Sequence, residues 1–240
     1  MAENTPLWLS RTNLLLGDER LEKLRNAHVL VVGLGGVGAY AAEMLCRAGV
    51  GELTIVDADI VQETNINRQL PALHTTIGQS KAEILHTRFL EINPKVIVHP
   101  IIEFIRDEKT DELLNNGYSY VVDAIDTLAP KSNLIAKTMA RGIPIVSSMG
   151  AGGKLDPTRV SIADVSKSHH CALAHMLRKR LSKMGIKKGF KVVFSDEEIQ
   201  PNSMVLAEEQ NKKSNVGTIS YMPAVFGICC ASAVIRDIVE

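Results

Sequence analysis

Residues 28–57 read "HVLVVGLGGVGAYAAEMLCRAGVGELTIVD". An apolar run turns through the glycine-rich "GLGGVG", continues for the length of a helix and ends in a second apolar run. A strand, a glycine turn, a helix and a second strand in this order are typical of the βαβ unit that binds a nucleotide. We therefore expect a Rossmann-like core that begins near residue 26.

The alternation continues along the chain, because short β-branched runs are separated by helix-length stretches such as residues 80–93 and 128–141. The expected strands are "HVLVV", "ELTIVD", "KVIVHPI", "YSYVVDAID" and "IPIVSS". Such alternation predicts an α/β fold, Rossmann-like and doubly wound, with a mainly parallel sheet and helices on both faces.

Composition fits one domain of ordinary size. The chain has 240 residues, 45% of them hydrophobic, and a net charge of zero. The charge is uneven, since residues 167–191 hold eight lysines and arginines and no acidic residue. A basic segment in a neutral protein indicates a polyanionic partner.

The chain shows no sign of membrane insertion or of a disulfide framework. The N-terminus lacks a basic and apolar leader, and the apolar run 221–235 is shorter than a typical span and contains Pro223. The four cysteines form no C-x-x-C pair, which disfavours a zinc ribbon. We expect a cytoplasmic protein without a membrane segment.

Two segments near the C-terminus differ sharply in character. Residues 196–217 are polar and poorly periodic, which predicts a long mobile loop with a functional role. Residues 218–239 are apolar and predict a buried closing helix.

The glycine turn and Asp57 form the first candidate site. In such turns the first glycine allows the tight bend, the second lets the backbone approach a phosphate, and the third lets the helix pack closely. Asp57 lies 19 residues beyond the last glycine, where a carboxylate can bind ribose hydroxyls. The alternative is a packing turn with a solvated aspartate. We assign Gly33, Gly35, Gly36, Gly38 and Asp57 to a nucleotide site.

Cationic residues that follow the glycine turn in the sequence indicate which kind of nucleotide the site binds. Arg68 and Lys81 follow the first strands on the side where doubly wound folds bind ligands, and such groups stabilise charge on phosphates. Asp123 and Asp126 end a further strand and could hold magnesium. A nicotinamide enzyme has no evident use for these cations, although single charges on loops are more often only solvated.

The motifs together resemble the ubiquitin-activating-enzyme-like adenylating superfamily of the ThiF, MoeB and HesA type. The motifs that carry the resemblance are "GLGGVG", "IVDAD", "NINRQ", "GQSKAE" and "DAID". The resemblance implies a single adenylating domain over residues 1–240, with a nucleotide-binding core at about 26–150 and substrate-binding and dimer elements at about 151–240. It implies that ATP adenylates a carboxylate.

The same resemblance implies roles for individual residues. Asp57 would bind ribose, Asp126 would bind Mg²⁺, and Arg11 would act across a homodimer. Asn65, Arg68 and Lys81 would contact phosphates, Gln69 follows the arginine as in the family motif, and Asp59 matches without a defined role.

Within the superfamily, five further motifs resemble the members that cyclise a modified adenosine beside the anticodon of tRNA. They are "RTNLLLG", "SYVVDAID", "GAGGKLDPTRVSIAD", "KVVFSDE" and "VGTISYMPAVFG". The partners implied are tRNA and a second copy of the chain, with room for a sulfur-transfer or activating partner protein. Cys171 is expected to be packed rather than to act as a nucleophile.

Two other functions remain open from the sequence. One is an adenylyltransferase that activates the C-terminus of a sulfur-carrier or ubiquitin-like protein, although such members usually carry two C-x-x-C pairs for zinc. The other is a nicotinamide-dependent oxidoreductase or a non-catalytic nucleotide-binding module, which Arg68 and Lys81 disfavour.

Overall fold

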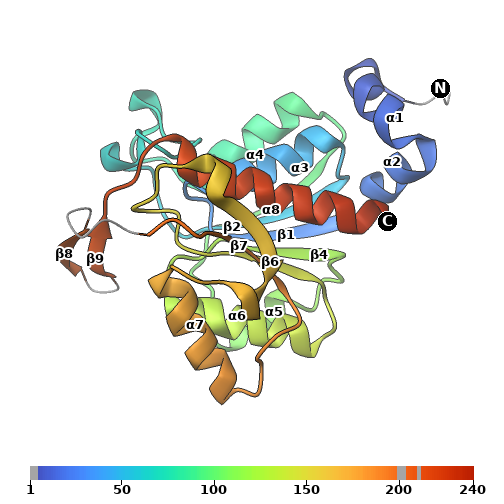
Figure 1. Cartoon of the computed structure of the whole chain (residues 1–240). Helices are drawn as coiled ribbons and strands as arrows, with labels where there is room; N and C mark the ends of the chain where they lie inside the picture. The colour runs from blue at the N-terminus through green and yellow to red at the C-terminus, as the bar shows by residue number, and fades with distance from the viewer. Residues whose placement is uncertain (1–4, 199–203, 210–211) are drawn as a thin grey trace.

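A computed structural model describes residues 5–198, 204–209 and 212–240. Within these residues seven strands form one sheet in the order β3-β2-β1-β4-β5-β7-β6 (Figure 1). Six strands run parallel and β6 pairs antiparallel with β7. The strands are β1 (His28–Val32), β2 (Glu52–Val56), β3 (Ile97–Ile101), β4 (Tyr120–Asp123), β5 (Ile145–Ser148), β6 (Val160–Asp164) and β7 (Lys191–Ser195). The predicted doubly wound α/β fold is confirmed.

Helices cover both faces of this sheet (Figure 1). One face carries α3 (Gly38–Ala48), α4 (Lys81–Ile92) and α8 (Tyr221–Val239), and the other carries α5 (Glu108–Leu113), α6 (Leu128–Ala140) and α7 (Ala172–Lys183). The helices α1 (Ser10–Leu16) and α2 (Asp18–Arg25) precede the sheet. The short 3-10 turns are η1 (Leu7–Leu9), η2 (Glu63–Asn65), η3 (His74–Thr76), η4 (Pro157–Arg159) and η5 (Val165–Lys167).

Strand periodicity divides the interior into two cores. Successive side chains of a strand point to opposite faces, so Val29 and Val31 pack under α3 and α8 while Leu30 and Val32 pack under α6 and α7. These residues are almost fully buried. The continuous apolar strands of the sequence therefore reflect a sheet covered on both sides.

The segment predicted as a long loop contains a hairpin. β8 (Met204–Glu209) pairs antiparallel with β9 (Lys212–Val216) and stands apart from the main sheet in Figure 1. Residues 199–203 and 210–211 lie outside the described residues. The prediction of a long mobile loop was wrong for the two strands. β8 (MVLAEE) has a continuous apolar run and β9 (KKSNV) is polar up to its last residue, so neither shows the apolar alternation that identifies a strand.

The closing helix α8 is confirmed as a core element. It is long and apolar enough to span a membrane by length and composition, which corrects the expectation that the apolar run falls short. However, Met222, Phe226, Cys230 and Val234 are fully buried in the core beneath it. Burial in a core accounts for the apolar character of the face that carries these residues, which belongs to a window that is 44% buried.

Gly227 sets the distance between α8 and α3. A Cβ atom at Gly227 would lie 2.3 Å from the carbonyl oxygen of Val37 and 3.0 Å from the amide nitrogen of Ala41. The two helices therefore touch through backbone, where no side chain can give way.

We predict that Gly227→Ala lowers the free energy of unfolding by about 1–3 kcal/mol or more, as overpacking does. Helix propensity alone would stabilise the variant by about 1 kcal/mol, so the sign of the change separates the two effects. Chemical denaturation measures it, with Ser232→Ala in the same helix as the control. An increase in stability on Gly227→Ala would mean that the helices do not approach this closely.

Candidate active site

The glycine turn joins the carboxyl end of β1 to the N-terminus of α3. Gly33 has a φ of 91°, which side chains disfavour, and a Cβ there would lie 2.7 Å from the carbonyl oxygen of Ala124. A Cβ at Gly38 would lie 1.8 Å from the carbonyl oxygen of Gly33. The backbone itself therefore requires glycine at the first and last positions.

The two middle glycines have different surroundings. A Cβ at Gly36 would lie 2.9 Å from Pro223, at the start of α8, whereas a Cβ at Gly35 would meet only the Gln69 side chain at 3.7 Å. The fold does not require glycine at position 35. Its absent side chain leaves room beside the amide groups at the N-terminus of α3, as a phosphate site needs.

Asp57 is tied to this turn. Its Oδ2 accepts a hydrogen bond of 2.6 Å from the amide of Leu34, and its Oδ1 accepts one of 2.8 Å from the amide of Asp59. Burial raises the pKa of Asp57, and the charge of Lys81 opposes that shift. Each oxygen has a further lone pair, so this carboxylate can still accept hydrogen bonds from two hydroxyls.

Lys81 is buried at the start of α4. Its Nζ forms an ion pair of 2.9 Å with Oδ2 of Asp59, whose side chain is 71% exposed. Asp59 therefore holds Lys81 near Asp57, which gives Asp59 the place in the site that the sequence left undefined. The ammonium group stands where it can neutralise a ligand anion.

Arg68 and Asp126 lie within electrostatic reach of each other. Arg68 donates hydrogen bonds of 2.8 Å to the carbonyl oxygen of Thr64 and to Oδ1 of Asn67. Partial burial lowers the pKa of Arg68, and Asp126 opposes that shift. The structure thus brings together, at one edge of the sheet, a cation and a carboxylate that are 58 residues apart in the sequence.

Asn65 and Gln69 shape the same loop. Oδ1 of the buried Asn65 accepts a hydrogen bond of 3.1 Å from the amide of Gln62, and its carbonyl oxygen accepts one of 2.9 Å from the amide of Gln69. Oε1 of Gln69 is buried, and no donor in the described part of the chain reaches it. The Gln69 atom nearest Gly35 is the amide nitrogen Nε2, 3.7 Å from where a Cβ of Gly35 would lie, so this side chain also presents a donor beside the turn.

The two aspartates of "DAID" have different environments. Asp123 is fully buried, and its Oδ2 contacts Nζ of Lys131 at 2.8 Å and accepts a hydrogen bond of 2.6 Å from the hydroxyl of Ser147. Asp126 is exposed. The carboxylate of Asp123 is thus enclosed in the core, whereas that of Asp126 is accessible to a ligand from solvent.

Lys131 was not among the site residues predicted from the sequence. Its Nζ also donates a hydrogen bond of 2.8 Å to the carbonyl oxygen of Ile125, so it fixes the loop that carries Asp126. The available signal was a lysine on the expected apolar face of a helix, four residues after Thr127.

Arg11 lies far from this site within one chain. It is exposed on α1, and the preceding Leu9 packs near Gly49, just beyond the last residue of α3. The glycine turn is at the other end of α3, about 16 Å away at about 1.5 Å per residue. Figure 1 shows α2 beside the C-terminus and α1 just beyond it, at the end of the molecule away from the start of α8. Within one chain, Arg11 is therefore not part of the site at the glycine turn.

The "GAGGK" segment, residues 150–154, ends in a second buried lysine, Lys154. Nζ of Lys154 donates to the carbonyl oxygens of His170, at 3.0 Å, and of Glu197, and burial lowers its pKa. Cys171 is buried, and its Sγ lies 3.6 Å from where a Cβ of Gly150 would be. This environment supports the expectation that Cys171 is packed.

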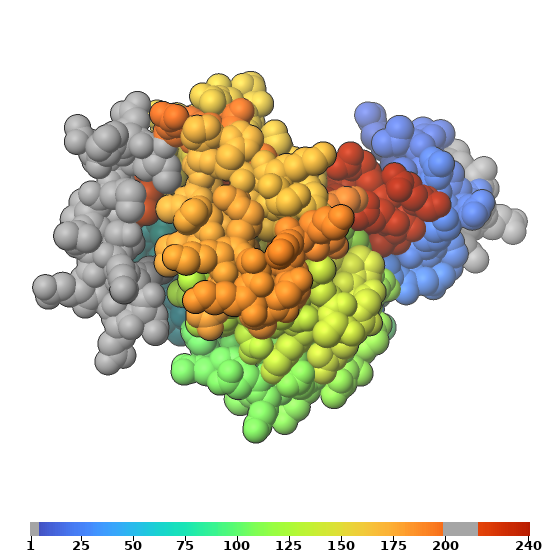
Figure 2. Space-filling view, turned by 60° about the horizontal axis from the view of Figure 1, so that its bottom comes forward, coloured from blue at the N-terminus to red at the C-terminus, as the bar shows by residue number. Residues whose placement is uncertain are grey.

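The basic segment is partly neutralised by the fold. Lys191 forms an ion pair with Asp237 of α8, whereas Arg178 is held by neutral acceptors, the carbonyl and hydroxyl oxygens of Ser168. Lys187 and Lys188 are exposed in the loop that enters the amino end of β7, away from the glycine turn. Figure 2 shows this orange segment on the face that it shares with α6.

Two other basic residues border the candidate site. Arg106 lies 4.7 Å from the centroid of the Phe104 ring, and both line a cavity of about 500 Å³ together with Arg180. Residues 127–130, directly after Asp126, form another wall of this cavity. A larger hollow of about 610 Å³ lies at the opposite edge of the sheet, near Glu19 and Tyr120, where no glycine turn is present.

The fold and this cation-lined glycine turn define a nucleotide-binding α/β protein whose site is built for phosphates. The ThiF family matches residues 9–240, and the chain belongs to that family.

Its relatives include two curated enzymes. The chain is 41% identical to the tRNA threonylcarbamoyladenosine dehydratase of Bacillus subtilis (strain 168), over 96% of this chain and 94% of the relative. It is 38% identical to the enzyme of the same name from Escherichia coli (strain K12), over 92% and 90%.

A crystal structure of the E. coli tRNA N6-threonylcarbamoyladenosine dehydratase in complex with ATP superimposes with a TM-score of 0.87 at 37% identity. The match covers 95% of this chain and 92% of that one. The same E. coli enzyme has been crystallised with AMP.

We predict that Lys131→Met lowers the free energy of unfolding by about 3–5 kcal/mol, because it strands the buried Asp123 carboxylate without its cation. Urea denaturation of the apo protein measures the change. Lys109→Met is the matched control, since the exposed ion pair of Lys109 with Glu103 should contribute less than about 1 kcal/mol. Equal effects in the two variants would contradict a special role for the buried pair.

Proposed function

We propose that this chain uses ATP to cyclise the threonylcarbamoyl group of a modified adenosine in tRNA, with net loss of water. One observation carries the proposal: Asp57, Lys81, Arg68 and Asp126 gather around an open glycine turn. The close relatives named for this activity extend over nearly the whole chain, which supports the choice of substrate.

The first step of the proposed reaction is transfer of AMP to a carboxylate. The threonyl carboxylate attacks the α-phosphate of ATP, an acyl-adenylate forms, and pyrophosphate leaves. Arg68 and Lys81 stabilise the negative charge that builds on the phosphate oxygens. Asp57 holds the ribose and thereby fixes the α-phosphate against the attacking oxygen.

The second step closes a ring within the substrate. A ureido nitrogen attacks the activated carbonyl carbon, loses its proton and expels AMP. Because the nitrogen and the carbonyl belong to the same nucleoside, the step is intramolecular and is strongly favoured. No enzyme nucleophile is needed, in agreement with the burial of Cys171.

A magnesium ion fits the donor set at Asp126. This exposed carboxylate stands opposite Arg68, where phosphate oxygens would supply the remaining ligands. When bound, the ion would neutralise phosphate charge. The nearby Asp123 would not bind it, because Lys131, Ser147 and the amide of Ile125 occupy that carboxylate.

The second candidate function is activation of a sulfur-carrier or ubiquitin-like protein. The molybdopterin-synthase adenylyltransferase of Salmonella typhimurium (strain LT2) is 36% identical over 54% of this chain. The likeness thus reaches only about half of the chain, which favours the tRNA substrate.

We further propose that the protein acts in the cytoplasm, where a sulfur-transfer or activating partner would meet it.

Release of AMP distinguishes the two functions. The full chain is incubated with ATP and Mg²⁺ and with either tRNA that bears threonylcarbamoyladenosine or candidate carrier proteins. We expect AMP with the modified tRNA, together with a mass loss of one water molecule from its nucleoside by mass spectrometry, because closure of the ring expels water. AMP release only with a carrier protein would overturn the proposal, as would no AMP with either substrate.

Arg68→Ala should slow AMP formation about a hundredfold or more, because such a cation acts in the transition state. The fold should persist, since the guanidinium group is only half buried and bonds within its own loop. Arg141→Ala is the control, because that arginine pairs with Asp111 far from the turn. Normal turnover by Arg68→Ala, with circular dichroism unchanged, would remove Arg68 from the mechanism.

We also propose that the protein is a homodimer in which Arg11 of each chain completes the site of the other. The helix that carries Arg11 presents an apolar surface: Leu14 is 77% exposed and Leu15 is 82% exposed. Leu7, just before this helix, is 91% exposed. Such a cluster favours contact with another protein surface.

Leu14→Glu combined with Leu15→Glu should therefore convert a dimer into a monomer and abolish AMP formation with the fold intact. Light scattering at micromolar concentration measures the mass. Met176→Glu, which places the same charge on the exposed face of α7, should leave the dimer unchanged. A wild-type monomer with full activity would refute both the dimer and the role of Arg11.

A further inference from the structure

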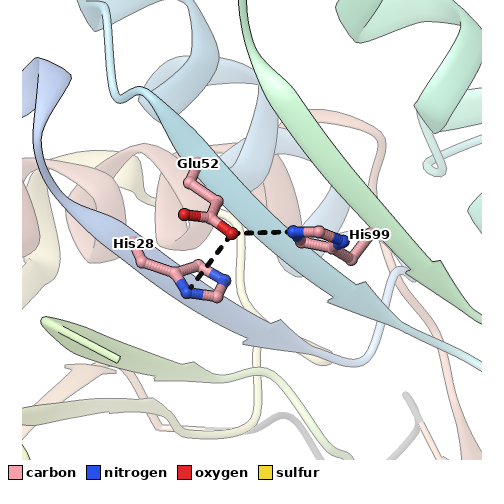
Figure 3. Close-up of side chains that lie close together, drawn as sticks. All are labelled: His28, Glu52 and His99. Carbon is pink, nitrogen blue, oxygen red and sulfur yellow. Dashed lines mark hydrogen bonds and ion pairs between the residues drawn. The ribbon is translucent and has the colours of Figure 1, made fainter. Parts of the chain in front are cut away.

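Three potential metal ligands converge on the sheet at the edge opposite the glycine turn. They are His28 at the start of β1, Glu52 at the start of β2 and His99 in the middle of β3 (Figure 3). One ligand atom from each lies within 4.8 Å of the other two. Among the described residues, this is the one group of histidine, cysteine and carboxylate side chains with such spacing.

Strand register places all three side chains on one face. His28 pairs with Glu52, and His99 pairs with Thr54, which is two residues beyond Glu52. Because side chains two residues apart in a strand share a face, the three must project together. They come from adjacent strands rather than from a flexible loop, so their spacing is set by the sheet.

The distances suit a cation better than a complete hydrogen-bond network. Nε2 of His99 lies 2.7 Å from Oε1 of Glu52, but Nδ1 of His28 lies 3.7 Å from the same oxygen, which is too long for a hydrogen bond. Bonds of about 2.0–2.1 Å place the ligands of a tetrahedral zinc ion about 3.3 Å apart. The two distances to Oε1 of Glu52 lie on either side of that spacing, and all three ligand atoms lie within 4.8 Å of one another, so rotation of the side chains can bring them to it.

The ring of His28 is already oriented. Its Nε2 makes a hydrogen bond of 2.8 Å with the hydroxyl of Thr54, and the ring of Tyr118 packs edge-on at 4.5 Å. A histidine ligand in proteins usually makes such a bond through its second nitrogen, which leaves the first free for the metal. Nδ1 of His28 is the nitrogen that faces Glu52.

We infer that His28, Glu52 and His99 form a binding site for a divalent transition-metal ion of the zinc class. Two imidazoles and one carboxylate are a ligand set that zinc uses. The side chain of His99 is 49% exposed and that of Glu52 is 34% exposed, so the ion can enter from solvent and water can complete its shell. The site lies about 16 Å from the glycine turn, a strand of five residues at about 3.3 Å each, so the ion would clamp strands rather than take part in nucleotide chemistry.

The test is calorimetric titration of Zn²⁺ into the full chain after chelator treatment and dialysis. We expect one ion per chain in the wild type. His99→Asn and Glu52→Gln should each weaken binding at least about tenfold, the lower end of the loss caused even by changes behind the ligands. His86→Asn, which removes a histidine of α4 outside the cluster, is the matched control and should bind as the wild type does.

Two further measurements separate binding at this site from nonspecific binding of the metal ion. The melting temperature of the wild type should rise by about 5–10 °C at a hundredfold excess of Zn²⁺ over its dissociation constant. The two ligand variants, folded by circular dichroism, should lose that rise. Co²⁺ should give a visible absorption band in the wild type and none in His99→Asn.

Stoichiometric zinc binding that survives in both ligand variants would place the ion elsewhere, for example at the partly exposed Cys229, and would overturn the inference. The absence of zinc binding in the wild type would overturn it as well. AMP release by His99→Asn should equal that of the wild type, so this result is independent of the proposed function.

Discussion

The close passage of the backbone at the glycine turn is the constraint on which the site depends. Gly38 comes so near the carbonyl oxygen of Gly33 that no side chain fits, and Gly33 in turn lies against Ala124 of the loop after β4. This contact locks β1, α3 and β4 together at the carboxyl edge. The Leu34 amide can then anchor Asp57, and the exposed Asp126 follows two residues after Ala124 at the same edge.

Basic and acidic side chains at this edge lie close together in pairs, even without a bound ligand. Lys81 is held by Asp59, and Arg68 stands opposite Asp126, while the Asp123–Lys131 pair is sealed in the core. A buried pair needs both partners, because a lone charge in the interior is costly. The site can therefore display cations towards phosphates while the scaffold beneath it stays neutral and rigid.

The two edges of one sheet carry different chemistry. The carboxyl edge gathers groups from the segments that follow the strands, including Lys81 at the start of α4, and the amino edge gathers His28, Glu52 and His99 from the strands themselves. Strand registers fix the spacing of the second group more tightly than loops fix the first. A structural ion at the amino edge and reaction at the carboxyl edge are compatible because the same five-residue strands separate them.

The sequence alone determined the parallel α/β core, because apolar periodicity and a glycine turn act locally and leave a readable pattern. It also identified Asp57, Arg68, Lys81 and Asp126 as candidates, since those residues sit beside motifs. Only the tertiary structure showed that Asp123 is buried against Lys131, that Lys191 pairs with Asp237, and that residues 204–209 and 212–216 form a hairpin. It alone brought His28, Glu52 and His99 together across 71 residues of sequence. Ion pairs and ligand clusters depend on strand order and register, and neither is encoded in the spacing of residues along the chain.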